Sequence, residues 1–148
     1  MDKPKFVYVT YIATTPEKLW EALTNADFTQ KYWNNVRVQS DWKMGSSIKY
    51  ADASKTWWEG EILEAEPPRH LSYTFCVTDS GEGPSRVVFE IEPEGKIVKL
   101  TLTHFDFEPT SKVLPRISTG WPQVLSNLKT LLESGSPLPD AGWGRADK

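Results

Sequence analysis

The segment from Gly120 to Gly135, GWPQVLSNLKTLLESG, constrains the fold most, because its apolar residues recur at intervals of three and four. That spacing predicts an amphipathic helix with a single apolar stripe. Gly135 suits the C-terminal cap, and Pro122 fits the first turn of a helix capped by Thr119 or Gly120, since first-turn N–H groups lack a helical partner anyway. The stripe consists of Trp121, Val124, Leu125, Leu128, Leu131 and Leu132. Another element of the fold must cover it.

Most of the preceding chain has the pattern of short strands separated by turns. The β-branched and aromatic residues of 5–13 predict a first strand. RVVFEIE and IVKLTLTHFDF alternate apolar and polar residues on either side of the turn PEGK, as the two arms of a hairpin do. Further strand-length runs lie at 35–42, 47–52, 56–66 and 71–78. The sequence therefore predicts about six antiparallel strands after the first one.

Two short helices are predicted between the first strand and the others. Thr15 is a suitable cap for a helix that has Pro16 in its first turn and ends near Leu23. Asn25 or Asp27 then caps a second helix whose aromatic residues lie on one side. The chain thus follows an α+β plan, in which the final helix covers one sheet.

The length and composition are typical of one globular domain, which we place at 1–135, with 136–148 as a loose C-terminal tail. A net charge of −3 argues against nucleic acid as a partner. The single cysteine, Cys76, excludes an internal disulfide and fits a reducing compartment.

The N-terminus lacks a signal-peptide pattern, and no apolar run approaches the roughly 18 residues of a membrane span. We therefore expect a cytoplasmic protein without a membrane partner.

Five segments together resemble the START-like superfamily (SRPBCC, helix-grip or birch-pollen-allergen-like). Within it they are similar to the family named after the activator of heat-shock-protein-90 ATPase. The segments span 11–33, 41–50, 60–75, 85–107 and 120–135. The resemblance implies a seven-stranded curved antiparallel sheet wrapped around a long C-terminal helix, with two short helices between strands 1 and 2. It also implies a cavity between sheet and helix, which relatives use for apolar or amphipathic ligands. The family name itself assigns no activity.

Two residues are candidates for acid/base chemistry. His104 ends the apolar face of the strand KIVKLTLTHFDFE, where it is either a catalytic or cavity-lining group or a core-edge histidine bonded to backbone. Glu64 points inward with Trp58 and Ile62 if its strand is regular, but a bulge near Leu63 reverses that direction. Neither residue is supported by a wider catalytic pattern.

No nucleophile motif or phosphate-binding loop occurs, and Cys76 lies on the strand face opposite to Tyr73, Phe75 and Val77. The chain has two histidines and scattered acidic residues, so we expect no metal and no cofactor. An enzyme is accordingly less expected than a binding domain.

The seven tryptophans are more informative than the charged residues. The predicted fold brings Trp20, Trp33, Trp58 and Trp121 to one place, where they either form an aromatic pocket or fill the core. Trp57 shares a face with Glu59 and Glu61, which suggests an outer position or a subunit contact.

Three functions remain open. The leading prediction is a domain that binds a small hydrophobic or amphipathic molecule between sheet and helix. Alternation predicts that the cavity is lined by Trp58, Ile62, Tyr73, Phe75, Val87, Phe89, Leu100, Leu102, His104, Trp121, Leu125 and Leu128. The alternatives are a chaperone-associated interaction protein, acting through its surface, and a cyclase- or hydratase-like enzyme that uses His104 or Glu64. A homodimer is left open.

Overall fold

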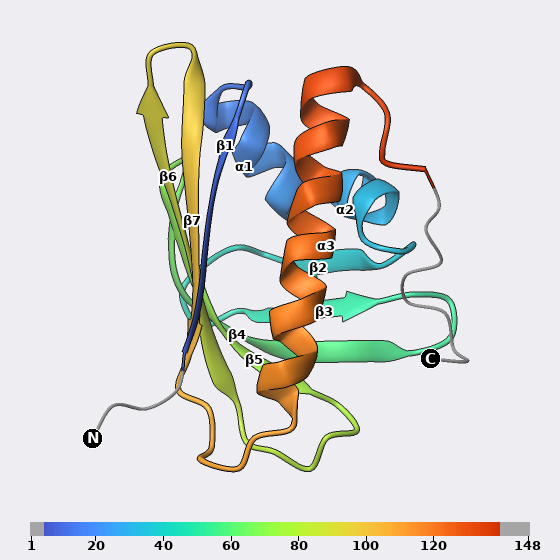
Figure 1. The fold of residues 1–148 in the computed structure, drawn as a ribbon. Helices are drawn as coiled ribbons and strands as arrows, with labels where there is room; N and C mark the ends of the chain where they lie inside the picture. Colours follow the sequence, from blue (N-terminus) through green and yellow to red (C-terminus); the bar gives the residue numbers. More distant parts are fainter. Residues whose placement is uncertain (1–4, 140–148) are drawn as a thin grey trace.

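The computed structural model describes residues 5–139, in which one curved sheet wraps around one long helix (Figure 1). The seven strands are antiparallel, in the order β1-β7-β6-β5-β4-β3-β2. The elements in chain order are β1 Phe6–Ile12, α1 Pro16–Thr24, α2 Ala26–Tyr32, β2 Arg37–Ser40, β3 Ser47–Ala51, β4 Thr56–Glu66, β5 His70–Val77, β6 Ser85–Glu94, β7 Ile97–Phe105 and α3 Val113–Ser134. The predicted α+β helix-grip architecture, with two short helices between β1 and β2, is confirmed. The proposed tail falls mostly outside the described residues.

The two short helices begin where their capping residues predict. Thr15 Oγ1 accepts a hydrogen bond from the Lys18 amide at 3.2 Å, and Asn25 Oδ1 accepts one from the Asp27 amide at 2.8 Å. Each bond satisfies an N–H group that has no partner within its own helix. In Figure 1, α1 and α2 lie beside the C-terminal half of α3, and both helices contact it.

Strand β4 changes direction through an irregularity in its pairing with β5 between Ile62 and Glu64. Nearby, Gly60 runs so close to β5 that an added Cβ would lie 1.8 Å from the Thr74 carbonyl oxygen, a contact that no side chain tolerates. The bulge reverses the alternation, so Glu64 is exposed and pairs with His70, Oε1 to Nε2 at 3.3 Å. Glu64 therefore does not face the interior as a regular strand would place it.

The core fills the concave side of the sheet beneath α3. Ile62, Tyr73, Phe89, Leu100 and Leu102 project from the central strands and are at most 2% exposed. Within residues 5–139, no helix is both long and apolar enough to cross a membrane.

Helix α3 begins at Val113, so the prediction that Thr119 or Gly120 caps the helix and that Pro122 occupies its first turn is wrong. The extra turns are capped by two side chains that lie far apart in sequence. Ser111 Oγ accepts from the Val113 and Leu114 amides, each at 3.1 Å. The Glu82 carboxylate, from the β5–β6 loop, accepts from the Lys112 amide at 2.7 Å and the Val113 amide at 3.2 Å.

The hydrogen bonds to Glu82 explain why α3 is stable from Val113 onward. Desolvation raises the pKa of Glu82, but hydrogen bonds from the Ser111 hydroxyl and from the Lys112 and Val113 amides outweigh it, and the pKa lies below its ordinary value. The helix N-terminus thus favours the charged carboxylate. Pro122 consequently lies in the helix interior, where it cannot donate to the Ser118 carbonyl.

Candidate functional site

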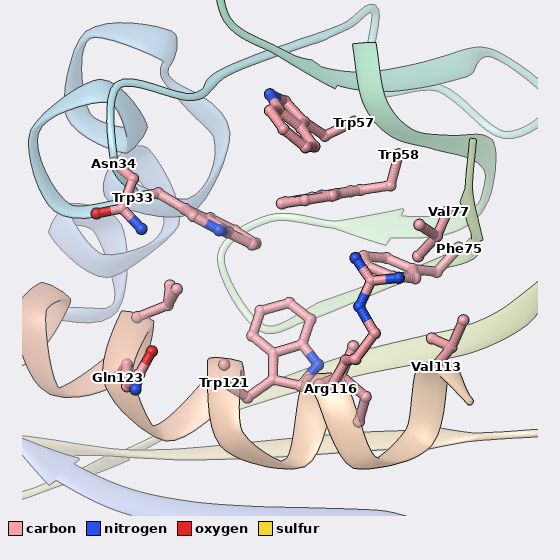
Figure 2. A pocket seen from close by; sticks show the side chains of 13 residues that line it. Trp33, Asn34, Trp57, Trp58, Phe75, Val77, Val113, Arg116, Trp121 and Gln123 are labelled. Atoms are coloured by element: carbon pink, nitrogen blue, oxygen red, sulfur yellow. The ribbon is translucent and has the colours of Figure 1, made fainter. Parts of the chain in front are cut away.

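A pocket of about 270 Å³ lies between the N-terminal half of α3 and the ends of β4 and β5 (Figure 2). It is partly open to solvent and mainly apolar. The residues that line it are Trp33, Asn34, Trp57, Trp58, Phe75, Val77, Val113, Arg116, Ile117, Gly120, Trp121, Gln123 and Val124. The buried side chains of α3 in this set follow one another at intervals of three and four, so the apolar stripe of the helix continues along the pocket.

Aromatic rings in mutual contact form most of the pocket wall. The Trp33 ring centroid lies 5.6 Å from that of Trp58 and 5.2 Å from that of Trp121. Phe75 lies 5.7 Å from Trp58 and 6.2 Å from Trp121. The rings are inclined to each other by 30° to 62°, a range that includes edge-to-face geometry. Rigid flat groups tilted in this way cannot close the space as branched aliphatic side chains do.

Trp57 joins this wall at its outer edge and is held there by the β3–β4 turn. Its Nε1 donates to Asp52 Oδ2 at 2.8 Å, and the Lys55 ammonium lies 4.2 Å from the ring centroid. Hydrogen bonds from Ser54 first, and then from Trp57, lower the pKa of Asp52 to about 2. The carboxylate therefore stays charged and fixes the indole ring. The sequence predicted an outer position for Trp57. In the structure its side chain is half-buried and lines the pocket.

Three polar side chains interrupt the apolar wall, and one of them is charged. Asn34 follows α2 with a positive φ of 48°, a conformation that asparagine adopts more readily than most residues. Gln123 and Arg116 come from α3, and Figure 2 shows the guanidinium group of Arg116 extending from the helix toward the strands. Among the described residues, none that line the pocket is acidic.

Behind Trp121, His104 is fully buried in a chain of hydrogen bonds. Trp121 Nε1 donates to His104 Nδ1 at 3.0 Å, and His104 Nε2 lies 2.7 Å from Ser85 Oγ. Ser85 Oγ donates in turn to the Phe75 carbonyl oxygen at 3.1 Å. An indole N–H only donates, so Nδ1 is the acceptor and the proton of the neutral ring is on Nε2. His104 therefore donates to Ser85.

Both ring nitrogens of His104 are engaged in this arrangement. A serine is activated by a neighbouring base, but here the nitrogen beside Ser85 carries the proton and the other nitrogen is occupied by Trp121. Burial lowers the pKa of His104 to about 3, so the ring is neutral at physiological pH. The hydrogen bonds support the core-edge interpretation of His104, although its partners are two side chains and not the backbone.

The twelve residues predicted to line a cavity separate into two groups. Trp58, Phe75 and Trp121 line the pocket. Trp121 meets Phe89 edge-to-face at 5.7 Å, so the space that we predicted between them is filled and the pocket lies on the other side of Trp121. The remaining nine are packed in the core with at most 2% exposure: Ile62, Tyr73, Val87, Phe89, Leu100, Leu102, His104, Leu125 and Leu128.

Sequence reasoning missed several residues of the pocket wall. Val113, Arg116 and Ile117 precede the predicted helix start, although Val113, Ile117 and Trp121 share a spacing of four that would have revealed them. Asn34 carried no comparable signal. Trp20, expected to join the other tryptophans, is half-buried on α1 and does not line the pocket.

One donor in the pocket wall lacks a partner. Trp58 Nε1 is buried, and no acceptor within hydrogen-bond distance is found among residues 5–139. Such a group is costly to bury and is normally satisfied by protein, water or ligand. In the same part of the chain, no group of three or more histidine, cysteine or acidic residues is arranged to hold a metal ion.

Comparisons with known proteins agree with this architecture. Residues 13–133 match the family described as Activator of Hsp90 ATPase homolog 1-like protein. No curated protein matches the chain. Among solved structures, the Aha1 dimer from Colwellia psychrerythraea is 23% identical, with a TM-score of 0.75 over 89% of this chain and 98% of that one.

Two further structures are similar over most of their length. PFC0360w, described as an HSP90 activator from Plasmodium falciparum, is 25% identical with a TM-score of 0.76, over 86% of this chain and 95% of that one. The protein ChR145 from Cytophaga hutchinsonii is 27% identical with a TM-score of 0.72, over 89% of this chain and 96% of that one.

Proposed function

Since the chain belongs to the family of Activator of Hsp90 ATPase homolog 1-like proteins, we propose that it is a non-enzymatic, cytoplasmic domain that binds a small hydrophobic or amphipathic molecule. The observation that carries this proposal is the aromatic pocket beneath the N-terminal half of α3. Ligand sites are typically concave, largely apolar and supplied with a few polar groups, and this pocket has all three properties.

The size of the pocket sets the size of its ligand. A protein cavity of about 150 Å³ accommodates benzene. A volume of about 270 Å³ therefore suits a molecule with roughly two fused rings, or a short alkyl chain of comparable bulk. Flat aromatic walls favour a flat ligand, because stacked or edge-to-face contacts supplement the burial of apolar surface.

The polar groups near the pocket favour binding over catalysis. The His104 ring is buried behind Trp121 and has both nitrogens engaged, and Glu64 lies on the outer face of the sheet. Neither residue lines the pocket, so neither of these two acid/base candidates reaches a molecule bound there.

The experiment that tests the proposal fills the pocket without disturbing the core. Gly120 lines the pocket, and an added Cβ meets no atom within 4 Å. Gly120→Leu should therefore abolish binding of naphthalene-2-carboxamide, a neutral two-ring probe, as measured by isothermal titration calorimetry. Thr119→Leu, on the exposed neighbouring position, is the matched control and should bind as the wild type does. Equal binding by both variants would contradict the proposed site.

Native mass spectrometry supplies a second test that needs no chosen probe. The protein purified under non-denaturing conditions should carry a small molecule that the Gly120→Leu variant lacks. A molecule that both proteins retain equally would be bound outside the pocket and would contradict the proposed site.

A second candidate is a chaperone-associated role, which is favoured by the similarity over 95% of the length of a protein described as an HSP90 activator. It predicts that the chain raises the ATPase rate of an Hsp90 chaperone and that Gly120→Leu leaves this effect intact, since a surface would act. The Colwellia protein is described as a dimer. Light scattering of this chain shows whether a homodimer forms here too.

A further inference from the structure

We propose that the ligand of this pocket carries a carboxylate or a similar anionic group on a flat apolar body, and that Arg116 binds that group. The inference rests on the proposed function, because it concerns the same pocket. It adds the charge of the ligand and the residue that selects it.

Arg116 is the single charged residue among the thirteen that line the pocket. The other polar groups there are the neutral amides of Asn34 and Gln123. Figure 2 shows the guanidinium group extending from α3 toward the side of the pocket formed by Trp58 and Phe75. A ligand that lies against these rings therefore has the positive charge of Arg116 at its edge, and the part of the wall that the structure describes holds no negative charge.

The guanidinium group has little competition for its donors among the described residues. Within residues 5–139, Arg116 forms no ion pair, hydrogen bond or cation–π contact, and its one electrostatic partner is Glu82. Glu82 is already engaged, since its oxygens accept from the Ser111 hydroxyl and from the Lys112 and Val113 amides. The five N–H donors of Arg116 thus remain available for a ligand.

Guanidinium and carboxylate groups form two parallel N–H···O bonds, which fix the orientation of the partner as well as its charge. The apolar rings beside Arg116 strengthen this attraction by excluding water from one side. Arg116 is itself exposed, so part of the attraction is screened by solvent and salt. We therefore expect a tenfold preference for the anion, on the order of one charge-assisted contact.

The experiment compares two probes that differ in charge but hardly in shape. 2-Naphthoate is the anionic probe, and naphthalene-2-carboxamide is its neutral counterpart. Calorimetric titration of the wild type should give a Kd about tenfold lower for 2-naphthoate, and the difference should shrink as salt is raised. In Arg116→Gln the two probes should bind within about threefold of each other, because the loss of affinity should fall mainly on 2-naphthoate.

Lys112→Gln is the matched control, because it removes one positive charge from the exposed start of the same helix without touching the pocket wall. It should retain the preference for the anion. Loss of the preference in Lys112→Gln as well would show a general effect of net charge and overturn the role of Arg116.

The two proposals fail in different ways. Equal binding of both probes by the wild type would overturn the anionic ligand but leave the apolar pocket as a binding site. If neither probe bound the wild type at millimolar concentration, the pocket would not be a site for two-ring ligands, and both proposals would be contradicted. A preference that Arg116→Gln retains would place the anion at another group.

Discussion

The two halves of α3 present one continuous apolar stripe to the sheet, yet one half is packed and the other lies over a pocket. In the C-terminal half, Leu125 and Leu128 are at most 1% exposed. The Asn127 side chain donates to the Tyr32 carbonyl oxygen at 3.0 Å. Lys129 Nζ donates to the Tyr11 carbonyl oxygen at 2.8 Å. This half is tied to both α2 and β1.

The N-terminal half is attached in a different way. The capping interaction with Glu82 and the Trp121–His104 hydrogen bond hold it, and tilted rings leave a space of about 270 Å³ beneath it. The comparison shows that side-chain shape, and not the apolar pattern, decides between core and pocket. Leu125 and Leu128 interdigitate with the core at the density typical of protein interiors, whereas the tilted rings of Trp33, Trp58 and Trp121 leave a space between them.

Truncating the packed half should have the largest effect on stability. Leu128→Ala removes a fully buried side chain and should lower the free energy of unfolding by about 2–5 kcal/mol. Ile117→Ala, beside the pocket, should cost less than half as much, because that side chain already borders empty space. Urea denaturation of the two variants measures the difference. Equal losses would show that the two halves are packed alike.

Acid should destabilise the fold through the buried, neutral His104. The unfolded chain protonates His104 near pH 6.5, whereas the folded protein does so only near pH 3, so the unfolded state binds more protons between these values. Stability should consequently fall as the pH decreases, by about 2 kcal/mol from His104 alone between pH 7 and pH 5.

His104→Gln isolates this contribution. Its amide can accept from Trp121 and donate to Ser85 but does not titrate, so the variant should lose less stability between pH 7 and pH 5 than the wild type. Urea denaturation at the two pH values gives the comparison. Parallel losses in both proteins would show that His104 is protonated in the folded state.

A structural feature could be predicted from the sequence when the residues that determine it are close together in the chain. Thr15 and Asn25 cap their helices through neighbouring amides, and those helix starts were predictable. The start of α3 was missed although Ser111 and the spacing of Val113, Ile117 and Trp121 are local signals. The other part of its cap, Glu82, lies 30 residues earlier in the chain and left no local signal. The position of the pocket was missed for the same reason, since it depends on how Trp33, Trp58 and Trp121 tilt against one another.

A substitution in the pocket wall, Gly120→Ala, should increase the stability of the fold slightly. Gly120→Ala adds a methyl group in open space within a helix, so it should raise the free energy of unfolding by about 0.5–1 kcal/mol. The same change should leave binding of a two-ring probe within a few fold. Differential scanning calorimetry with and without the probe measures both effects. A loss of stability would indicate that the helix needs a glycine there.

The most direct test of the central claim follows the tryptophan indole N–H signals by NMR during titration with naphthalene-2-carboxamide. Binding in the pocket should shift the signals of Trp33, Trp58 and Trp121, whose rings form its wall, and leave those of Trp20 and Trp42 in place. The Trp58 signal is of special interest, because its N–H lacks an acceptor among residues 5–139. Shifts confined to Trp20 and Trp42, or spread equally over all five, would contradict a ligand site beneath the N-terminal half of α3.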